Sequence, residues 1–223
     1  MTQAQKAEQL VVSKQRVADF GEVYTSKREV NAMLDLVAHE AERIDSRFLE
    51  PACGTGNFLS EILQRKLNIV RTRYSKIQLE YERYAILAIS SIYGIDILED
   101  NVQECRARLL EILRSDYESL YKNNTNQDCL KSAKYILDRN IQWGDALSLM
   151  TVATPAEPIV FSEWSAVNGS LLKRRDFSFK NLIAHESVRE LPLFSDLGDD
   201  VFIPTPLKEY PLVQFLKVAD GIE

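Results

Sequence analysis

The sequence predicts an α/β fold with a doubly wound, mostly parallel sheet, followed by a β-hairpin and an irregular tail. Three short apolar runs, around residues 48–50, 92–97 and 140–143, alternate with longer segments of helical spacing. Such alternation is typical of parallel sheets, whose right-handed crossovers bring the carboxyl ends of the strands to one edge. Further along the chain, Asn168-Gly169 marks a tight turn between two apolar segments.

The length of 223 residues suits one globular domain with a small appendage. We expect an N-terminal arm over residues 1–20, a core over 21–150, and a hairpin with an extended tail over 151–223 that completes or decorates the core. The net charge of -6 argues against tight, autonomous binding to duplex DNA, because proteins that clamp DNA usually carry a basic face.

The distribution of cysteines and apolar residues predicts a cytoplasmic chain without a metal site or membrane segment. Cys53, Cys105 and Cys129 show neither a CxxC pair nor metal-ligand spacing, and both histidines are isolated. The polar N-terminus has no apolar signal-peptide core. The longest apolar stretch, residues 84–95, is too short to cross a bilayer.

The first element expected is an amphipathic helix over residues 27–44. Ser26 is a plausible N-cap, and Glu29 three residues later completes a capping box. A strand over 48–50 must stop at Pro51, which has no N–H for a ladder hydrogen bond. The apolar face of the helix consists of Val30, Met33, Leu34, Val37, Ala41 and Ile44.

The rest of the core follows the same alternation of helix and strand. We expect helices over 57–66 and 77–92, a strand over 92–97, a helix over 100–121, a polar loop over 122–128, a helix over 129–138 and a strand over 140–143.

The C-terminal part predicts a hairpin with strands over 158–166 and 171–179, joined through Asn168-Gly169. The tail over 191–223 contains four prolines, which favour extended, irregular chain over helix.

The segment from Phe48 to Leu59, FLEPACGTGNFL, has the residues of a ligand-binding turn. Gly54 and Gly56 lie where a strand passes into a helix, so that the backbone can approach a ligand closely. The helix N-terminus adds free amide donors that suit an anion such as a carboxylate. The spacing matches neither GxxxxGK[ST] nor GxGxxG, which argues against a nucleotide P-loop. The alternative is a glycine turn without a ligand.

Asp96 ends the second strand of the core. A carboxylate at this place can accept hydrogen bonds from both hydroxyls of a ribose, as it does in dinucleotide-binding folds. Alternatively, Asp96 only caps the helix that follows it.

The segment Phe48–Leu59 resembles the S-adenosylmethionine (SAM) motif (D/E)PACGxGxFL of bacterial N6-adenine DNA methyltransferases, with Glu50 where that family often has Asp. Phe20–Thr25 resembles the N-terminal GxxxTP motif, with Ser26 in place of the proline. Residues 93–97 and 140–147 resemble the next two SAM motifs. The resemblance implies a class I SAM-methyltransferase fold in which Gly54 and Gly56 line the methionine end of SAM. The residues implied in cofactor binding are Thr25, Glu50, Pro51, Ala52, Gly54, Gly56, Asn57, Phe58, Asp96, Ile97, Asp145 and Ala146.

In that family Thr25 would contact the methionine moiety, and Asp145 would accept from the adenine amino group of SAM. Thr25 and Ser26 are alternatively no more than a helix cap, and an Asp that follows a Gly is common on protein surfaces.

The catalytic motif of that family, (D/N/S)PP(Y/F/W), has no counterpart, because the sequence contains no Pro-Pro dipeptide. The resemblance therefore covers about residues 20–150, and no catalytic residue is assigned. It implies a SAM-dependent DNA methyltransferase that modifies adenine N6 within a restriction-modification or phage-defence system. The alternatives are a catalytically inactive SAM-binding subunit that needs a partner chain, and a methyltransferase that acts on RNA or protein.

The run Lys173-Arg174-Arg175 lies on the predicted second hairpin strand, close in sequence to Phe177 and Phe179. A basic and aromatic strand can contact phosphate and base. A solvated strand edge that prevents aggregation is the more frequent role of such a run.

Overall fold

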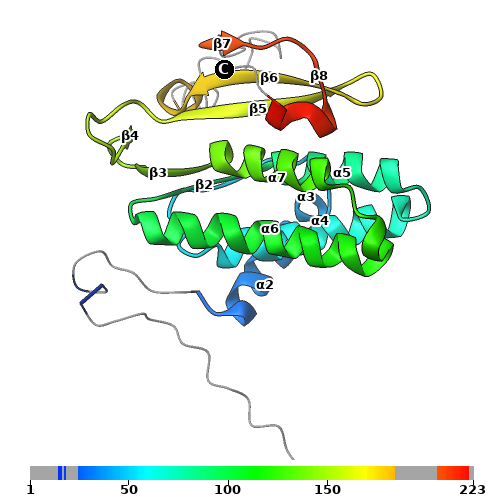
Figure 1. The fold of residues 1–223 in the computed structure, drawn as a ribbon. Helices are drawn as coiled ribbons and strands as arrows, with labels where there is room; N and C mark the ends of the chain where they lie inside the picture. The colour runs from blue at the N-terminus through cyan, green and yellow to red at the C-terminus, as the bar shows by residue number, and fades with distance from the viewer. Residues whose placement is uncertain (1–14, 17, 19–24, 184–204, 221–223) are drawn as a thin grey trace, which may run out of the picture.

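The fold consists of a small, mostly parallel sheet, a group of long helices that extend from it, and a second, antiparallel sheet that lies across them (Figure 1). The computed structural model describes residues 15–16, 18, 25–183 and 205–220. The arrangement is mixed α/β and compatible with a Rossmann-like fold, which confirms the sequence prediction at this level.

The first sheet has the strand order β1-β2-β3-β4. The strands β1 (Phe48–Glu50), β2 (Ile92–Asp96) and β3 (Ile141–Asp145) are parallel, and they confirm the three predicted core strands to within about two residues. The short strand β4 (Met150–Thr151), which the sequence did not predict, pairs antiparallel with β3. Within the described residues the sheet therefore extends from β1 in one direction only.

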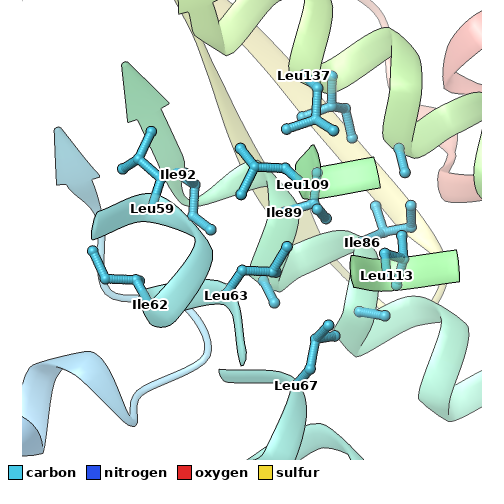
Figure 2. Close-up of a cluster of buried hydrophobic side chains, with 14 of the residues drawn as sticks. Leu59, Ile62, Leu63, Leu67, Ile86, Ile89, Ile92, Leu109, Leu113 and Leu137 are labelled. Carbon is cyan, nitrogen blue, oxygen red and sulfur yellow. The ribbon is translucent and has the colours of Figure 1, made fainter. Parts of the chain in front are cut away.

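Two long helices carry the crossovers between the parallel strands. Helix α4 (Asn57–Tyr74) packs on β1 and β2, and α6 (Glu99–Tyr121) packs on β2 and β3. Both are much longer than the strands, so their far ends pack on α5 (Gln78–Ser90) and α7 (Gln127–Asn140). Leucine and isoleucine side chains from these helices and from β2 form the main core, as Figure 2 shows.

The predicted helix over residues 27–44 is wrong as a single element. The structure has α2 (Lys27–Leu36) and a one-turn α3 (Ala38–Ala41), separated by Val37 with φ -121° and ψ 31°. The Ser26–Glu29 capping box is present. Met33 and Val37 do not face the core as expected and are 54% and 40% exposed. Val37 lies at the break between the two helices, whereas Met33 lies within α2, in which Val30 and Leu34 are the buried residues.

Other boundaries differ where the helices extend further than their apolar periodicity suggested. Helix α4 continues to Tyr74 instead of ending near Lys66. Helix α7 begins at Gln127, where Asn126 caps it, and the expected polar loop before it contains the 3-10 turn η1 (Lys122–Asn124). These extensions lie where neighbouring helices supply packing, which overrides weak local signals.

The predicted hairpin is confirmed as β5 (Val160–Val167) and β6 (Leu171–Ser178). Asn168 (φ 35°) and Gly169 (φ 69°) form the turn between them, in the left-handed conformations that such turns require. The short strands β7 (Lys208–Glu209) and β8 (Val213–Gln214) pair with the other edge of β6.

The tail is extended in these two strands but ends in the 3-10 helix η3 (Phe215–Asp220), which packs on α7 and was not predicted. The expectation for residues 191–204 lies outside the described residues.

The two faces of the parallel sheet have different coverings. A Cβ added at Gly94 would lie 3.0 Å from Leu59 of α4, so this face of β2 is pressed against the helix. On the other face, Tyr93 and Ile95 pack with Phe161 and neighbouring side chains of the second sheet. No helix in the described part of the chain is long and apolar enough to cross a membrane.

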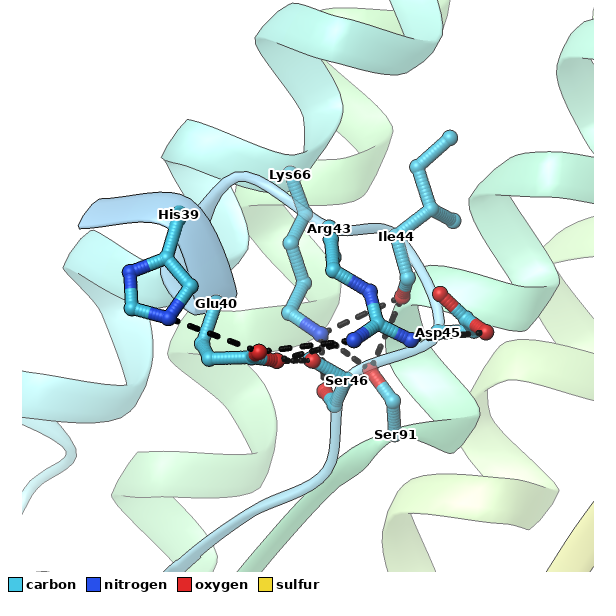
Figure 3. Close-up of polar contacts among 8 residues, drawn as sticks. All are labelled: His39, Glu40, Arg43, Ile44, Asp45, Ser46, Lys66 and Ser91. Carbon is cyan, nitrogen blue, oxygen red and sulfur yellow. Dashed lines mark hydrogen bonds and ion pairs between the residues drawn. The ribbon is translucent and has the colours of Figure 1, made fainter. Parts of the chain in front are cut away.

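A buried lysine ties α4 to the segment before β1. Lys66 is fully buried, and its Nζ donates to the carbonyl oxygen of Ile44 (3.2 Å), to the carbonyl oxygen of Ser46 and to Ser91 Oγ (2.6 Å) (Figure 3). Burial lowers the pKa of Lys66 to about 7, while the nearby carboxylate of Asp45 opposes this shift.

Candidate cofactor site

The carboxyl ends of the three parallel strands lie along one edge of the sheet. Each strand ends on a carboxylate, Glu50 in β1, Asp96 in β2 and Asp145 in β3. Because the strands are parallel, three residues that are 46 and 49 positions apart in the sequence meet at this edge. We refer to this edge as the strand-end rim.

The glycine loop between β1 and α4 closes onto β2. The Cys53 N–H donates to the carbonyl of Ile95 (2.9 Å), and the Gly56 N–H donates to the carbonyl of Cys53 (2.8 Å). Gly54 (φ 51°) and Gly56 (φ 86°) adopt left-handed conformations. A Cβ on Gly56 would lie 2.7 Å from Cys105 Sγ of α6, so packing as well as dihedral angle requires glycine there.

The N-terminus of α4 presents uncapped amides toward the rim. Its N-cap is Gly56, which has no side chain to accept from them, and the first turn contains no acidic residue. An 18-residue helix with this N-terminus has a partial positive charge that favours an anion. Pro51 and Ala52 of the preceding loop are exposed, and Phe58 in the first turn is half-buried.

Asn57 joins the predicted N-terminal motif to the glycine loop. Its Nδ2 donates to the carbonyl of Thr25 (3.2 Å), and its Oδ1 accepts from Arg108 of α6 (2.7 Å). The structure therefore places Thr25 beside the first turn of α4, although the two residues are 32 positions apart. The other residues of that motif, 20–24, lie outside the described residues.

Asp96 is the residue of the strand-end rim that accepts hydrogen bonds from several segments. Its Oδ2 accepts from the Gly54 N–H (2.8 Å), and its Oδ1 accepts from the Leu98 N–H (2.9 Å) and from Asn101 Nδ2 (3.2 Å). Only 9% of the residue is exposed. The bonds to Leu98 and Asn101 are those of a helix cap, while the bond to Gly54 links two predicted cofactor motifs. With about four lone-pair sites on a carboxylate, one acceptor position remains for a hydroxyl.

Asp145 stabilises its own turn and is solvent-accessible. Its carboxylate accepts from the Leu147 N–H (2.9 Å) and the Ser148 N–H (3.3 Å), and these bonds lower its pKa. Asp145 therefore stays ionised at neutral pH and can accept further hydrogen bonds. Ala146 follows directly in this turn. Ile97, at the end of β2, is 44% exposed, and its carbonyl accepts from Trp143 Nε1 (3.1 Å).

Glu50 is partly buried at the end of β1. Burial raises the pKa of its carboxyl, although the Ala52 N–H (3.3 Å) opposes this by donating to it. Glu50 is thus the rim carboxylate whose charge is least compensated, so a positively charged ligand group nearby would lower its pKa again.

Arg16 is a rim residue that the sequence did not single out. Its guanidinium pairs with Asp100 of α6 (2.5 Å) and donates to Asn101 Oδ1 (3.2 Å), directly beside the Asp96 carboxylate. No motif marks an arginine in a polar arm 84 residues from its partner, so only the folded chain reveals this contact.

The basic run on β6 is compensated within the fold. Lys173 pairs with Glu209 (2.9 Å), Arg174 with Asp176 (2.7 Å) and Arg175 with Glu163 (2.9 Å). The interpretation of this run as a solvated strand edge is wrong, because β6 has paired strands on both sides. Contact of Lys173, Arg174 and Arg175 with DNA stays a prediction.

Metal-ligand geometry is not found within the described ranges, where no group of three His, Cys, Asp or Glu residues could hold an ion. Cys53, Cys105 and Cys129 are free and buried. Comparisons with protein-family models, with curated proteins and with solved structures found no match to this chain.

Proposed function

We propose that this chain is the SAM-binding part of a methyltransferase that modifies the N6 atom of adenine in DNA. The observation that carries the proposal is the hydrogen bond from the Gly54 N–H to the Asp96 carboxylate. It joins the glycine loop after β1 to the acid at the end of β2, the two segments whose sequences resemble SAM motifs most closely.

The charged and hydrogen-bonding groups of the strand-end rim support a ligand with the groups of SAM. The uncapped N-terminus of α4 suits the carboxylate of a methionine moiety. The partly buried Glu50 suits its ammonium group. Asp96 retains one acceptor position for a ribose hydroxyl, and the partly exposed Asp145 can accept from an adenine amino group.

The choice of DNA adenine as the methyl acceptor rests on the resemblance of the segment FLEPACGTGNFL to the SAM motif of N6-adenine DNA methyltransferases. No contact among the described residues bears on the acceptor. SAM supplies an activated methyl group on its sulfonium sulfur, and the acceptor base must be flipped out of the duplex to reach it. The chain offers no Pro-Pro motif to hold that base. This absence favours the variant of the proposal in which the chain acts as a SAM-binding subunit and a partner chain completes the catalytic site.

The proposal is tested by titrating SAM into the purified chain and into Gly54→Val in a calorimeter. Valine at φ 51° is strained and places a branched side chain in the loop proposed to hold the methionine moiety, so SAM binding should be lost. Gly169→Val is the matched control, because Gly169 has a similar φ of 69° with no neighbour within 4 Å and lies in the hairpin turn. Loss of binding in both variants, or in neither, would contradict the assigned site.

Asp96→Asn tests the nucleoside end of the same site. The amide keeps the volume of the carboxylate but removes its charge and one acceptor oxygen, so SAM affinity should fall about tenfold or more. Asp100→Asn is the control, because Asp100 is a neighbouring carboxylate that pairs with Arg16 instead of ending a strand. Equal losses would mean that the rim responds only to net charge.

A further inference from the structure

One face of helix α6 contacts the proposed SAM site at three places. Asn101, Cys105 and Arg108 are spaced at i, i+4 and i+7, so they follow one another along this face. Asn101 Nδ2 donates to the Asp96 carboxylate at the end of β2 (3.2 Å). Cys105 Sγ lies 2.7 Å from the position of a Cβ on Gly56. The third residue, Arg108, reaches the start of α4.

Arg108 is bound to the glycine loop by two hydrogen bonds from one nitrogen. Its Nη1 donates to Asn57 Oδ1 (2.7 Å) and to the carbonyl oxygen of Thr55 (3.4 Å). Thr55 lies between the two glycines of the loop, and Asn57 is the first residue of α4. The guanidinium therefore joins α6 to the loop at the point where the loop becomes a helix.

The side-chain amide of Asn57 is held between a donor and an acceptor. A guanidinium can only donate and a carbonyl can only accept, so Oδ1 faces Arg108 and Nδ2 faces the Thr25 carbonyl (3.2 Å). Aspartate at position 57 would accept from Arg108 but could not donate to Thr25. Without Arg108, the amide loses the partner that fixes its orientation and can rotate away from Thr25.

The contact between Asn57 and Thr25 sets where the first residues of α2 lie. Val30 and Leu34 of α2 are buried in the main core, and α2 packs on α4. Thr25 lies before the N-cap of α2, ahead of these packed residues. Its bond from Asn57 places it beside the uncapped amides of α4, which are proposed above to bind the methionine carboxylate.

We propose that Arg108 is a positioning residue for the methionine end of the SAM site. It fixes the Asn57 amide, and Asn57 in turn holds Thr25 beside the N-terminus of α4. We refer to these three residues as the Arg108 relay. Its effect on SAM rests on the function proposed above, whereas its two hydrogen bonds stand on the geometry alone.

The exposure of Arg108 separates a role in the site from a role in the fold. The side chain is exposed, and so is its bond to Asn57. Exposed polar contacts of this kind contribute little to global stability, so Arg108→Met should leave the midpoint of urea denaturation as it is in the parent. A residue that only supported the fold would lower the midpoint and the SAM affinity together.

The first experiment tests the relay without a ligand, by hydrogen–deuterium exchange of the peptide that covers residues 25–30. Arg108→Met should increase exchange there about threefold, because the start of α2 loses its link to α4. Arg108→Lys keeps a donor for Asn57 and should restore part of the protection. The matched control is Arg114→Met, at an exposed arginine of α6 that pairs with Glu111. Exchange in Arg108→Met that equals the control would overturn the relay.

The second experiment is a double-mutant cycle on SAM affinity, measured by calorimetry. Arg108→Met should weaken SAM binding about fivefold in the parent chain and should have no effect in Asn57→Ala, where the relay is already broken. Arg108→Lys should retain most of the parent affinity. An equal loss in both backgrounds would overturn the positioning role, because Arg108 would then act on SAM without Asn57.

The two experiments distinguish failure of the relay from failure of the proposed function. A parent chain that does not bind SAM, but shows the expected exchange in Arg108→Met, would overturn the proposed function and the role of Arg108 in SAM binding. The contact of Arg108 with Asn57 and Thr25 would then stand as a link within the fold. Normal SAM binding without the exchange effect would overturn the relay alone.

Discussion

The glycines at the rim illustrate how one residue type serves two purposes. Gly54 donates its N–H to Asp96 and adopts φ 51°, whereas Gly56 adopts φ 86° and lies against Cys105. The first glycine links the loop to the end of β2, and the second allows α4 and α6 to approach each other. Substitutions at the two positions should therefore fail for different reasons.

Gly56→Ala should destabilise the fold by about 2–4 kcal/mol, the sum of left-handed strain and overlap with Cys105 Sγ. Gly169→Ala carries similar strain without a neighbour and should cost about 1 kcal/mol. Urea denaturation gives both values. Cys105→Ala combined with Gly56→Ala should recover part of the loss. Equal costs at the two glycines would show that Cys105 moves aside freely.

At the scale of single elements, the second sheet depends on an arginine in its central strand. Arg174 is 11% exposed, pairs with Asp176 through two nitrogens and stacks on Tyr210 at 4.0 Å. Tyr210 also donates to Asp176, which ties the chain after β7 to β6. A planar guanidinium can make all these contacts at once, whereas an ammonium cannot.

Arg174→Lys should therefore destabilise the protein by about 1–3 kcal/mol in urea denaturation. Arg114→Lys, at a 45% exposed arginine on α6, should change the stability by less than about 0.5 kcal/mol. If Arg174→Lys left the stability intact but weakened a measured affinity of the chain for DNA, the residue would be a phosphate contact instead.

The same scale explains which elements could be predicted. The capping box at Ser26, the turn at Asn168-Gly169 and the strand stop at Pro51 depend on neighbours in the sequence, and all three are present. The break at Val37 and the extension of α4 to Tyr74 depend on packing against other elements. Local patterns contain no information on those partners.

At the scale of the whole molecule, the buried Lys66 makes stability depend on pH. Its pKa is about 7 in the folded chain and about 10.5 in the unfolded chain. Between these values the unfolded chain binds the extra proton, so the free energy of unfolding should increase as pH rises from 7 toward 10. Below pH 7 both states are protonated, and the cost of the buried charge is fully present.

Lys66→Met should flatten this increase between pH 7 and 9, measured by urea denaturation at several pH values. Lys76→Met, at an exposed lysine, should leave the slope as it is in the parent. At pH 7 Lys66→Met also loses three hydrogen bonds, so the slope, and not the stability at one pH, is the informative quantity. An unchanged slope would place the titration of Lys66 outside this range.

The sequence by itself determined the local elements and the chemistry of the motif after β1. Helical periodicity, caps, turns and glycine spacing are set by residues within a few positions of one another, and they predicted the three parallel strands. They also predicted Gly54 and Asp96 as site residues, but not that one would donate to the other.

Only the tertiary structure decided the contacts between distant segments. It joined Gly54 to Asp96 and Arg16 to Asp100, and it made β6 a central strand. In the part of the chain that the structure describes, it also left β1 at the edge of its sheet. These contacts depend on which strands pair and which helices pack. That pairing and packing is stabilised by interactions between residues far apart in the chain, so a pattern within one segment does not predict it.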